Sequence, residues 1–282
     1  METRSIFPPL TGWEATRDAL HGYARAVAFI PRAHAIAHPQ WWHISLKVHP
    51  DGLVTDNMAL PDGGIFCLKM DLHRHQVLLL TSRGDALEFS MLAGLSEAQF
   101  RDRLLEAVAG LGLEGVYALE KAGGREPATY DPAAAQKYFA ALVNADRVFN
   151  LQRARLGGER GPVQLWPHGF DLAFEWFGTR QVTLSEKGVS RSYPAQLNLG
   201  FSPGESSHPE PYFYSNPWPF EAEHLLDKPL PGGARWFTGS WQGSLLPYQE
   251  LVGDDRAEQR LLDYAQAVFQ ASAPTLLAGD KP

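Results

Sequence analysis

Short apolar segments separated by turns constrain the fold of this chain most. Segments of strand length lie at about residues 65–72, 76–82 and 86–91, with no helical period between them. The turns are Pro61-Asp62-Gly63-Gly64 and Ser82-Arg83-Gly84-Asp85, where proline fixes φ and glycine supplies positive φ. Strands that cluster between helices in this way exclude a regularly alternating βαβ fold and favour antiparallel sheets.

Helical periodicity flanks these strands. The first helix is expected to begin at a capping box formed by Thr11 and Glu14, and Pro31 is expected to end or kink it. A second capping box, Ser96 with Gln99, predicts a helix after the strands. The first half of the chain is therefore expected to fold as helix, sheet and helix.

The second half of the chain repeats this order. Asp131-Pro132 predicts the start of a long helix, because aspartate caps a helix and proline fits its first turn. The last helix is expected to be capped by Asp255 and Glu258 and to end before Pro274. Further strands are expected at about residues 41–48, 116–119, 163–177, 196–201, 211–215 and 235–241.

The order helix, strands, helix thus occurs twice, and Trp41-Trp42 in one half matches Leu165-Trp166 in the other. Residues 121–129 are polar and punctuated by glycine and proline, so they are the best linker. The sequence predicts an α+β protein of two related helix–antiparallel sheet–helix units, an internal duplication packed into one body. These units are residues 1–124 and 125–282, the second with a proline- and aromatic-rich segment at 185–235.

Charge and cysteine content exclude several function classes. The chain carries 25 Lys and Arg against 32 Asp and Glu, a net charge of -7, without a basic run. It is therefore not expected to bind nucleic acid or an anionic membrane. Its one cysteine, Cys67, excludes a disulfide framework and a cysteine-based metal cluster. Since the sequence shows no signal peptide and no apolar segment of about 20 residues, we expect a cytoplasmic protein.

One group of metal-binding residue types lies near residue 70. Asp71, His73 and His75 share a face if the strand continues through them, and that spacing would suit zinc or iron. If a hairpin turn occupies Leu72-His73-Arg74 instead, the three side chains separate. Both interpretations remain open, and the sequence specifies no cofactor.

Polar side chains on other predicted elements are candidates for a ligand site. Asp171 lies on the polar face of the strand at 163–177, and His43 lies on the polar side of the strand at 41–48. Asp146 and Arg147 lie on the long helix. At the surface these groups would make ordinary ion pairs, whereas in the wall of a cavity they would contact a polar ligand.

Aromatic residues are concentrated among prolines at 193–220, where Tyr212 and Tyr214 lie. The prolines exclude this segment from regular helix and from central strands, so its aromatic side chains must pack against another part of the chain. The segment is expected to form either a rigid cover over the core or a lid over a ligand. Trp42 is a further candidate for stacking on a ligand.

An ordered set of motifs spans nearly the whole chain. They include Trp41-Trp42-His43, Asp146-Arg147, Phe170-Asp171-Leu172-Ala173, Pro211-Tyr212-Phe213-Tyr214 and Leu246-Pro247-Tyr248, together with Asp71 followed four residues later by His75. This set resembles the bacterial domain-of-unknown-function family 5996.

The chain departs from the pattern of that family at two places. Gly161 and Gln164 stand where the family pattern has Ser and then His, and Ser192-Tyr193-Pro194-Ala195-Gln196 replaces a Tyr-Ser-His-Glu-like run. The resemblance implies one full-length unit, and it implies no established reaction.

The sequence therefore predicts a small-molecule-binding protein with an aromatic-rimmed polar pocket, and it leaves catalysis, ligand identity and homo-oligomer formation open. Asp171 and His75 are the candidates for proton transfer, and Arg147 is the candidate for pairing with an anion. The other candidate ligand contacts are Trp42, His43, Asp146, Tyr212 and Tyr214. The alternative is a non-catalytic interaction or structural protein whose aromatic residues form the core and a subunit interface.

Overall fold

Two compact units make up the chain. The computed structural model describes residues 6–117, 124–186, 188–205 and 208–279. Unit 1 consists of Met1–Pro9, Asn144–Val163 and Leu172–Pro282, and unit 2 consists of Leu10–Val143 and Gln164–Asp171. Each unit is thus assembled from separate segments of the chain, whereas the sequence predicted two continuous units. Helices and two antiparallel sheets are present, so the predicted α+β class is confirmed.

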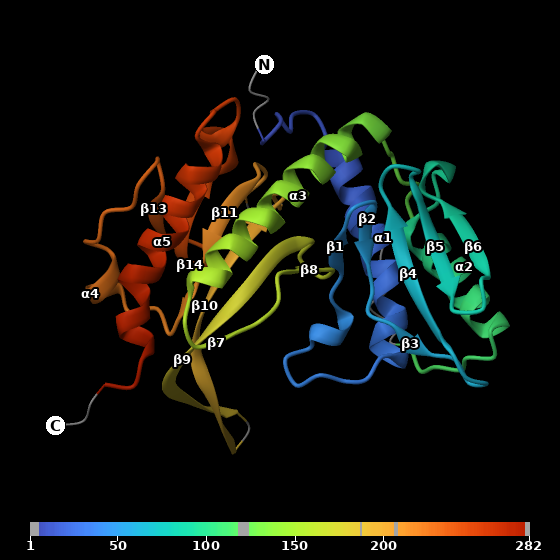
Figure 1. Ribbon diagram of the computed structural model, residues 1–282, viewed down its shortest axis with the longest axis horizontal. Helices are drawn as coiled ribbons and strands as arrows, with labels where there is room; N and C mark the ends of the chain where they lie inside the picture. Colours follow the sequence, from blue (N-terminus) through green and yellow to red (C-terminus); the bar gives the residue numbers. More distant parts are fainter. Residues whose placement is uncertain (1–5, 118–123, 187, 206–207, 280–282) are drawn as a thin grey trace. The chain divides into compact units, whose positions relative to one another are not determined.

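The sheet of unit 2 is a set of short antiparallel strands in the order β1-β2-β4-β5-β6, with β3 paired to β4 (Figure 1). Its strands are β1 (Lys47–His49), β2 (Gly52–Val54), β3 (Met58–Ala59), β4 (Ile65–Asp71), β5 (Gln76–Thr81) and β6 (Ala86–Ser90). The predictions for β4, β5 and β6 are confirmed to within one residue at each end. Asp71 pairs with Gln76, so residues 72–75 form the turn between β4 and β5.

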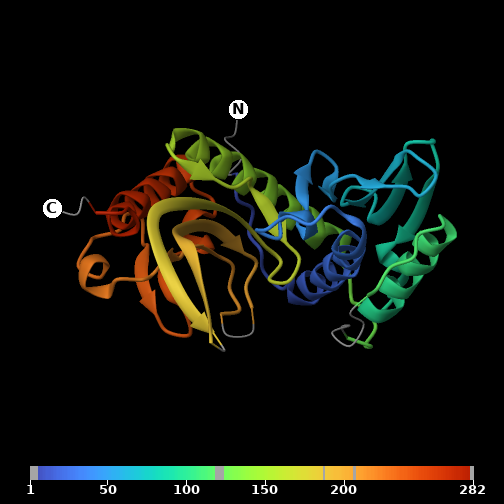
Figure 2. The ribbon, with the colours of Figure 1, turned by 90° about the horizontal axis from the view of Figure 1, so that it is seen from below.

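Two helices, α1 (Glu14–His34) and α2 (Glu97–Gly110), cover one face of this sheet (Figures 1 and 2). The fully buried rings of Tyr23 from α1 and Phe100 from α2 lie 4.4 Å apart, centroid to centroid. The apolar stripes of both helices therefore meet in one core.

Only one of the two predicted capping boxes is present. Ser96 and Gln99 exchange both hydrogen bonds at the start of α2, as predicted. The box at the start of α1 is wrong: the N-cap residue is Trp13, which makes no side-chain capping bond. Pro31 lies inside the last turn of α1, where the helix ends within one turn and few hydrogen bonds remain to be lost.

The strand predicted at 41–48 is wrong over most of its length. Residues Trp42–Ile44 form the short 3₁₀ helix η1, and the strand β1 begins only at Lys47. Trp41 adopts the left-handed conformation with φ 61°, which breaks the alternation that the sequence pattern suggested. The strand predicted at 116–119 is absent at residues 116 and 117, and residues 118–119 lie outside the described part of the chain.

Helix α3 (Pro132–Arg155) begins as predicted, because the Asp131 carboxylate accepts a hydrogen bond from the backbone N–H of Ala133 at 2.9 Å. Its residues up to Val143 belong to unit 2 and those from Asn144 to unit 1. An apolar stripe of this helix is buried, at Tyr138, Leu142, Ala145 and Phe149.

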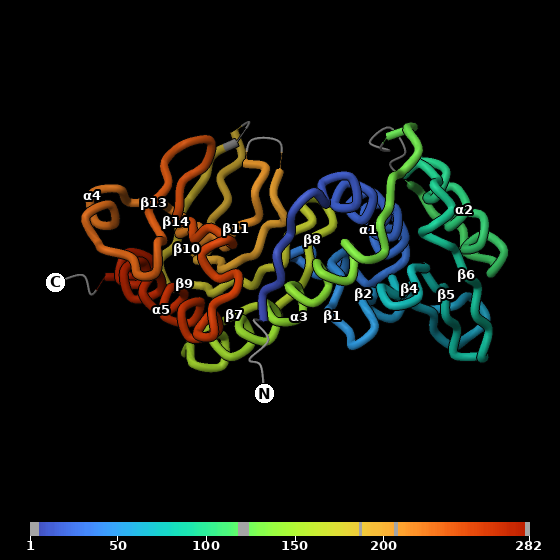
Figure 3. The backbone as a smooth tube through the Cα atoms, turned by 90° about the horizontal axis from the view of Figure 1, so that it is seen from above, coloured from blue at the N-terminus to red at the C-terminus, as the bar shows by residue number. Residues whose placement is uncertain are grey.

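Unit 1 is built around a second antiparallel sheet, in the order β13-β14-β11-β10-β9-β7, with β12 paired to β10. Helix α5 packs along β10, as Figure 3 shows. Phe149, Phe201, Phe213 and Tyr248 form the centre of its core, together with Phe7. The elements are β7 (Glu159–Arg160), β9 (Asp171–Glu186), β10 (Val189–Ser202), β11 (Tyr212–Ser215), β12 (Pro217–Trp218), α4 (Ala222–Leu225), β13 (Arg235–Thr238), β14 (Gln242–Pro247) and α5 (Ala257–Leu276).

Several boundaries in the second half differ from prediction. The strand predicted at 163–177 is divided into β8 (Gln164–Trp166) and β9 by a turn in which Phe170 has φ 56°. β10 is far longer than expected, since Pro194 is accommodated at an irregularity in its pairing with β9.

The last helix also differs. Its N-cap residue is Arg256, which makes no side-chain capping bond, so the predicted caps Asp255 and Glu258 are wrong. The helix continues through Pro274 to Leu276.

The two sheets differ in strand number and order, and the structure does not confirm the predicted internal duplication. Among the described residues, no helix combines the length and the apolar composition that crossing a bilayer requires.

Replacing Gly52 by alanine should destabilise unit 2 by about 2–3 kcal/mol. Gly52 has φ +154°, and an added Cβ would lie 1.9 Å from the Met70 carbonyl oxygen on β4. Gly110→Ala is the matched control, because no atom lies within 4 Å of its added Cβ and α2 should gain up to about 1 kcal/mol. Urea unfolding measures both, and a Gly52→Ala protein as stable as the wild type would contradict the described pairing of β2 with β4.

Candidate functional site

A cavity of about 180 Å³ lies in unit 2, beside α1 and the turn that follows β8. For comparison, an apolar cavity of ~150 Å³ holds benzene. Half of its lining is apolar, and the other half consists of charged or imidazole side chains. The apolar residues are Ala28, Phe29, Ile44 and Pro167, and the polar ones are Arg25, Arg32, Glu97 and His168.

A buried ion pair forms one wall of this cavity. The Glu97 side chain is 7% exposed, and its Oε1 accepts a hydrogen bond from Nε of Arg25 at 3.0 Å, while Oε2 pairs with Nη2 of Arg25. The third nitrogen of Arg25, Nη1, lies 3.3 Å from Nε2 of His21. Arg25 thus meets the buried Glu97 carboxylate with two of its nitrogens and supplies the opposite charge that a buried carboxylate needs.

Arg32 on the last turn of α1 is in a different situation. Its side chain is exposed, and its guanidinium carbon lies 5.7 Å from the ring centroid of Trp41. In the described part of the chain, no carboxylate lies within ion-pair distance of Arg32. Trp41 is itself 54% exposed, has φ 61° and stacks on His43 at 5.6 Å. The cavity thus carries one guanidinium whose charge is not balanced by an acid.

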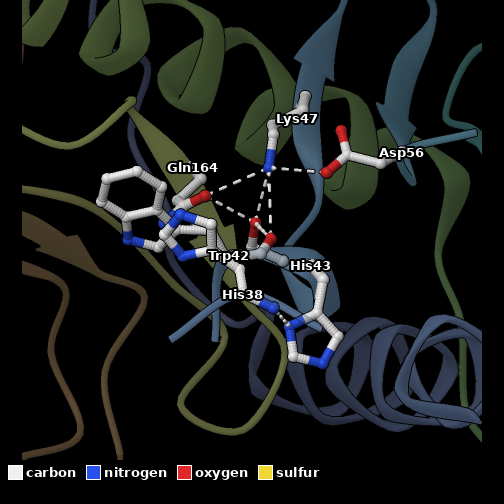
Figure 4. Close-up of polar contacts among 7 residues, drawn as sticks. His38, Trp42, His43, Lys47, Asp56 and Gln164 are labelled. Carbon is white, nitrogen blue, oxygen red and sulfur yellow. Dashed lines mark hydrogen bonds and ion pairs between the residues drawn. The ribbon is translucent and has the colours of Figure 1, made fainter. Parts of the chain in front are cut away.

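A polar network next to η1 holds the other wall in place (Figure 4). Nζ of Lys47 donates to Oγ of Ser45 at 2.7 Å and to Oε1 of Gln164 at 3.1 Å, and Ser45 donates to the same Gln164 oxygen at 2.6 Å. Asp56 lies 3.7 Å from Nζ of Lys47. Burial lowers the pKa of Lys47, and Asp56 opposes this shift.

The network fixes the orientation of Gln164. The Lys47 ammonium can only donate, so the amide oxygen of Gln164 must face it, and the amide nitrogen points away. Gln164 is fully buried, and among the described residues its Nε2 has no hydrogen-bond partner. Leu165, the next residue, exchanges two backbone hydrogen bonds with Leu46, at 2.8 and 2.9 Å. β8 is thereby attached to the segment after η1, and it leads directly to Pro167 and His168 of the cavity.

Two residues predicted from the sequence, Trp42 and His43, immediately precede the cavity residue Ile44. Trp42 stacks on His38 with 4.3 Å between ring centroids, and Nδ1 of His43 accepts a hydrogen bond from the His38 backbone at 3.1 Å (Figure 4). Burial is the main cause of the lowered pKa of His43, and His38 and Arg32 add to it. His43 is therefore neutral at pH 7.

His21 is a further imidazole near the cavity. Its ring stacks on Phe170 at 5.5 Å, and its Nε2 lies 3.1 Å from the carbonyl oxygen of His168. Burial, together with the neighbouring Arg25, lowers the pKa of His21 to about 4.

Asp71, His73 and His75 make separate contacts around the turn between β4 and β5. The buried Asp71 carboxylate accepts the backbone N–H groups of His73 and Arg74, at 3.0 and 2.8 Å. The exposed His73 ring lies against Phe139, and Nδ1 of the buried His75 lies 2.9 Å from the Tyr130 hydroxyl. The described residues contain no group of three or more His, Cys, Asp or Glu arranged to hold a metal ion.

The remaining predicted residues lie outside the cavity lining. Asp171 stands at the start of β9, beside the buried Tyr138, whose pKa is raised by burial and by the Asp171 charge. In unit 1, Arg147 pairs with Glu258 of α5 at 2.6 Å. Burial raises the pKa of Asp146 to about 6, against a smaller opposing effect of the hydrogen bond from Asn150.

Tyr212 and Tyr214 lie on the face of the unit 1 sheet opposite Phe213. Their ring centroids lie 6.1 and 6.2 Å from that of Trp241. Gly200 lies under the Tyr214 ring, where a Cβ would come within 2.3 Å of it.

The predicted residues therefore belong to two units. Trp42, His43, Asp71, His73, His75 and Asp171 are in unit 2, whereas Asp146, Arg147, Tyr212 and Tyr214 are in unit 1. Neither unit by itself contains the whole predicted set.

Sequence reasoning missed the charged residues of the cavity. Arg25 and Glu97 are 72 positions apart, and no local pattern links them. The available signal was the acidic residue in the first turn of α2, which sits on the buried side of an amphipathic helix. Gln164 stood out in the sequence only as a departure from the pattern that the resemblance implies.

Gln164→Leu should destabilise the protein by about 1–3 kcal/mol, because Ser45 and Lys47 lose their shared acceptor in a buried site. Gln249→Leu is the matched control, since Gln249 is exposed. Chemical unfolding at pH 7 measures both variants. Equal stability of the Gln164→Leu and Gln249→Leu proteins would show that the network does not hold β8.

Asp146→Asn should stabilise the protein at pH 8 by about 1–2 kcal/mol and leave it unchanged near pH 4. The raised pKa means that the folded chain keeps this proton up to about pH 6, whereas the unfolded chain loses it near 3.8. Stability from this group is therefore present at low pH and is lost as the pH rises through 6. Urea unfolding at both pH values measures the change in stability, and Asp227→Asn is the control because Asp227 is exposed. The same pH dependence in both variants would contradict the prediction.

The comparisons with known proteins give a family and no further relative. No curated protein and no solved structure matches the chain. A family described as a family of unknown function, DUF5996, matches residues 7–277, nearly the whole sequence. The resemblance stated from the ordered motifs is thereby confirmed, and the chain belongs to the DUF5996 family.

Proposed function

We propose that this chain is a small-molecule-binding protein and that the cavity of unit 2 is its binding site. The observation that carries the proposal is the composition of the lining, in which an apolar floor meets the exposed Arg32 guanidinium. Ligand sites of proteins combine apolar walls with a few convergent polar groups in this way. Of the residues predicted from the sequence, Trp42 and His43 directly precede the lining residue Ile44, and Trp41 lies under the Arg32 guanidinium.

The walls of the cavity support a preformed site. Glu97 and Arg25 hold α1 against α2, and the Gln164 network holds β8 against the segment after η1. Both sets of contacts lie inside unit 2, so binding needs no ordering of the wall. A preformed site favours a compact, rigid ligand.

The proposal concerns binding and leaves turnover open. His168 and His21 are the imidazoles nearest the cavity, and they are the groups that would move a proton if the protein is an enzyme. The alternative is a non-catalytic interaction protein, which the exposed Ile36 and Trp41 side chains favour.

Ala28→Leu should abolish binding of small ring compounds, because the added atoms fill part of a cavity of about 180 Å³. Ala133→Leu is the control, since Ala133 is exposed in the first turn of α3. Saturation-transfer NMR with a library of compounds of about benzene size measures binding. Compounds that bind the wild type and Ala133→Leu but not Ala28→Leu support the proposal. A library without hits, or hits that persist in Ala28→Leu, would overturn it.

A further inference from the structure

The charges around the unit 2 cavity do not cancel. Arg25 and Arg32 each contribute one positive charge to the lining, and Glu97 contributes one negative charge. Glu97 is neutralised by its two contacts with Arg25, so the remaining charge belongs to Arg32. In a chain of net charge -7, a cavity with one unbalanced guanidinium favours an anion.

Arg32 lies over the ring face of Trp41. An aromatic ring attracts a guanidinium through the ring face, and the N–H groups lie in the guanidinium plane. The guanidinium carbon of Arg32 lies over the Trp41 ring, and among the described residues no hydrogen bond or ion pair is recorded for the Arg32 N–H groups. The planar N–H donors of a guanidinium pair with the two oxygens of a carboxylate.

The neighbouring Glu97 limits the charge of the ligand to one. A dianion such as a phosphate monoester would place its second charge near a carboxylate that already has its full set of partners. Arg25 cannot turn to a ligand without leaving Glu97 buried and unpaired. A carboxylate matches the single charge that Arg32 offers.

The apolar half of the lining defines the rest of the ligand. Ala28, Ile44 and Pro167 are buried, and Phe29 also lies 5.8 Å from the guanidinium carbon of Arg101. Arg101 is 8% exposed, and within the described residues its Nη1 has no hydrogen-bond partner. Nε and Nη2 of Arg101 donate to the Asp102 carboxylate, so the charge of Arg101 is balanced and the preference for a negative ligand rests on Arg32.

We infer that the cavity of unit 2 binds a small monocarboxylate with a compact ring or branched apolar body, and that Arg32 pairs with its carboxylate. This inference rests on the proposed function, and it names the ligand class of that same site. A ring of benzene size fits the volume of about 180 Å³.

Matched pairs of an acid and its neutral amide test the inference. Benzoate with benzamide, and isovalerate with isovaleramide, differ in charge and hardly in shape. Calorimetry and saturation-transfer NMR at pH 7 should show that each acid binds at least about tenfold more tightly than its amide. Arg32→Gln should remove this difference and leave the affinity for the amide unchanged, which also shows that the variant is folded.

Arg103→Gln is the control for a general loss of positive charge, because Arg103 is exposed on α2 and outside the cavity lining. It should leave the preference for acids intact. Arg32→Lys should retain part of it, since lysine keeps the charge and loses the planar fork. Phenyl phosphate should bind more weakly than benzoate.

The outcomes separate the two proposals. If amides and acids bind equally and Ala28→Leu abolishes both, the cavity is a binding site and the inferred ligand class is wrong. If the wild type and Arg32→Gln prefer acids over amides to the same extent, Arg32 does not pair with the carboxylate and the inference is overturned. If no acid or amide binds to the wild type, the inferred ligand class is wrong. If no compound of the whole library binds to the wild type, the proposed function is overturned as well.

Discussion

The Glu97 carboxylate, buried between two helices, is the constraint on which the rest of unit 2 depends. A charge in that position must be paired, and Arg25 pairs with it through two nitrogens. This contact joins α1 to α2 across 72 residues of sequence and fixes one wall of the cavity. The same contact sets the net charge of the cavity lining. Because the charge of Arg25 is neutralised by Glu97, the charge of Arg32 is left unbalanced. The arginine that pairs with Glu97 and the arginine that we propose as the ligand contact thus lie about two turns apart on α1.

The second wall depends on a neutral amide. Lys47 and Ser45 both donate to Gln164, and a side chain at this position must therefore present an acceptor to them. A neutral histidine at this position would offer one acceptor nitrogen and would serve only one of these donors well. Gln164 offers an oxygen with two lone pairs and accepts from both. The consequence for function is indirect, because the network positions Pro167 and His168 and none of its polar groups belongs to the cavity lining.

The sequence predicted those parts of the fold that short-range rules determine. Turn signals placed β4, β5 and β6, and local caps placed the starts of α2 and α3. It failed at Trp41 and Phe170, where a bulky residue takes positive φ and ends an apparent strand, because tertiary packing sustains that conformation. In the site, too, only the residues of local motifs could be predicted. Trp42 and His43 were found because they belong to a local motif, whereas Arg25, Arg32 and Glu97 come together only through the packing of α1 on α2.

We propose that Arg32 holds the carboxylate of a small ligand in the unit 2 cavity. A crystal structure of the protein soaked with benzoate tests it most directly. We expect density for the ring beside Phe29 and Ile44, with both carboxylate oxygens about 2.7–2.9 Å from the Arg32 nitrogens and the Arg25–Glu97 pair unchanged. A benzoate bound elsewhere, or one that reaches the cavity by displacing Glu97 from Arg25, would contradict it.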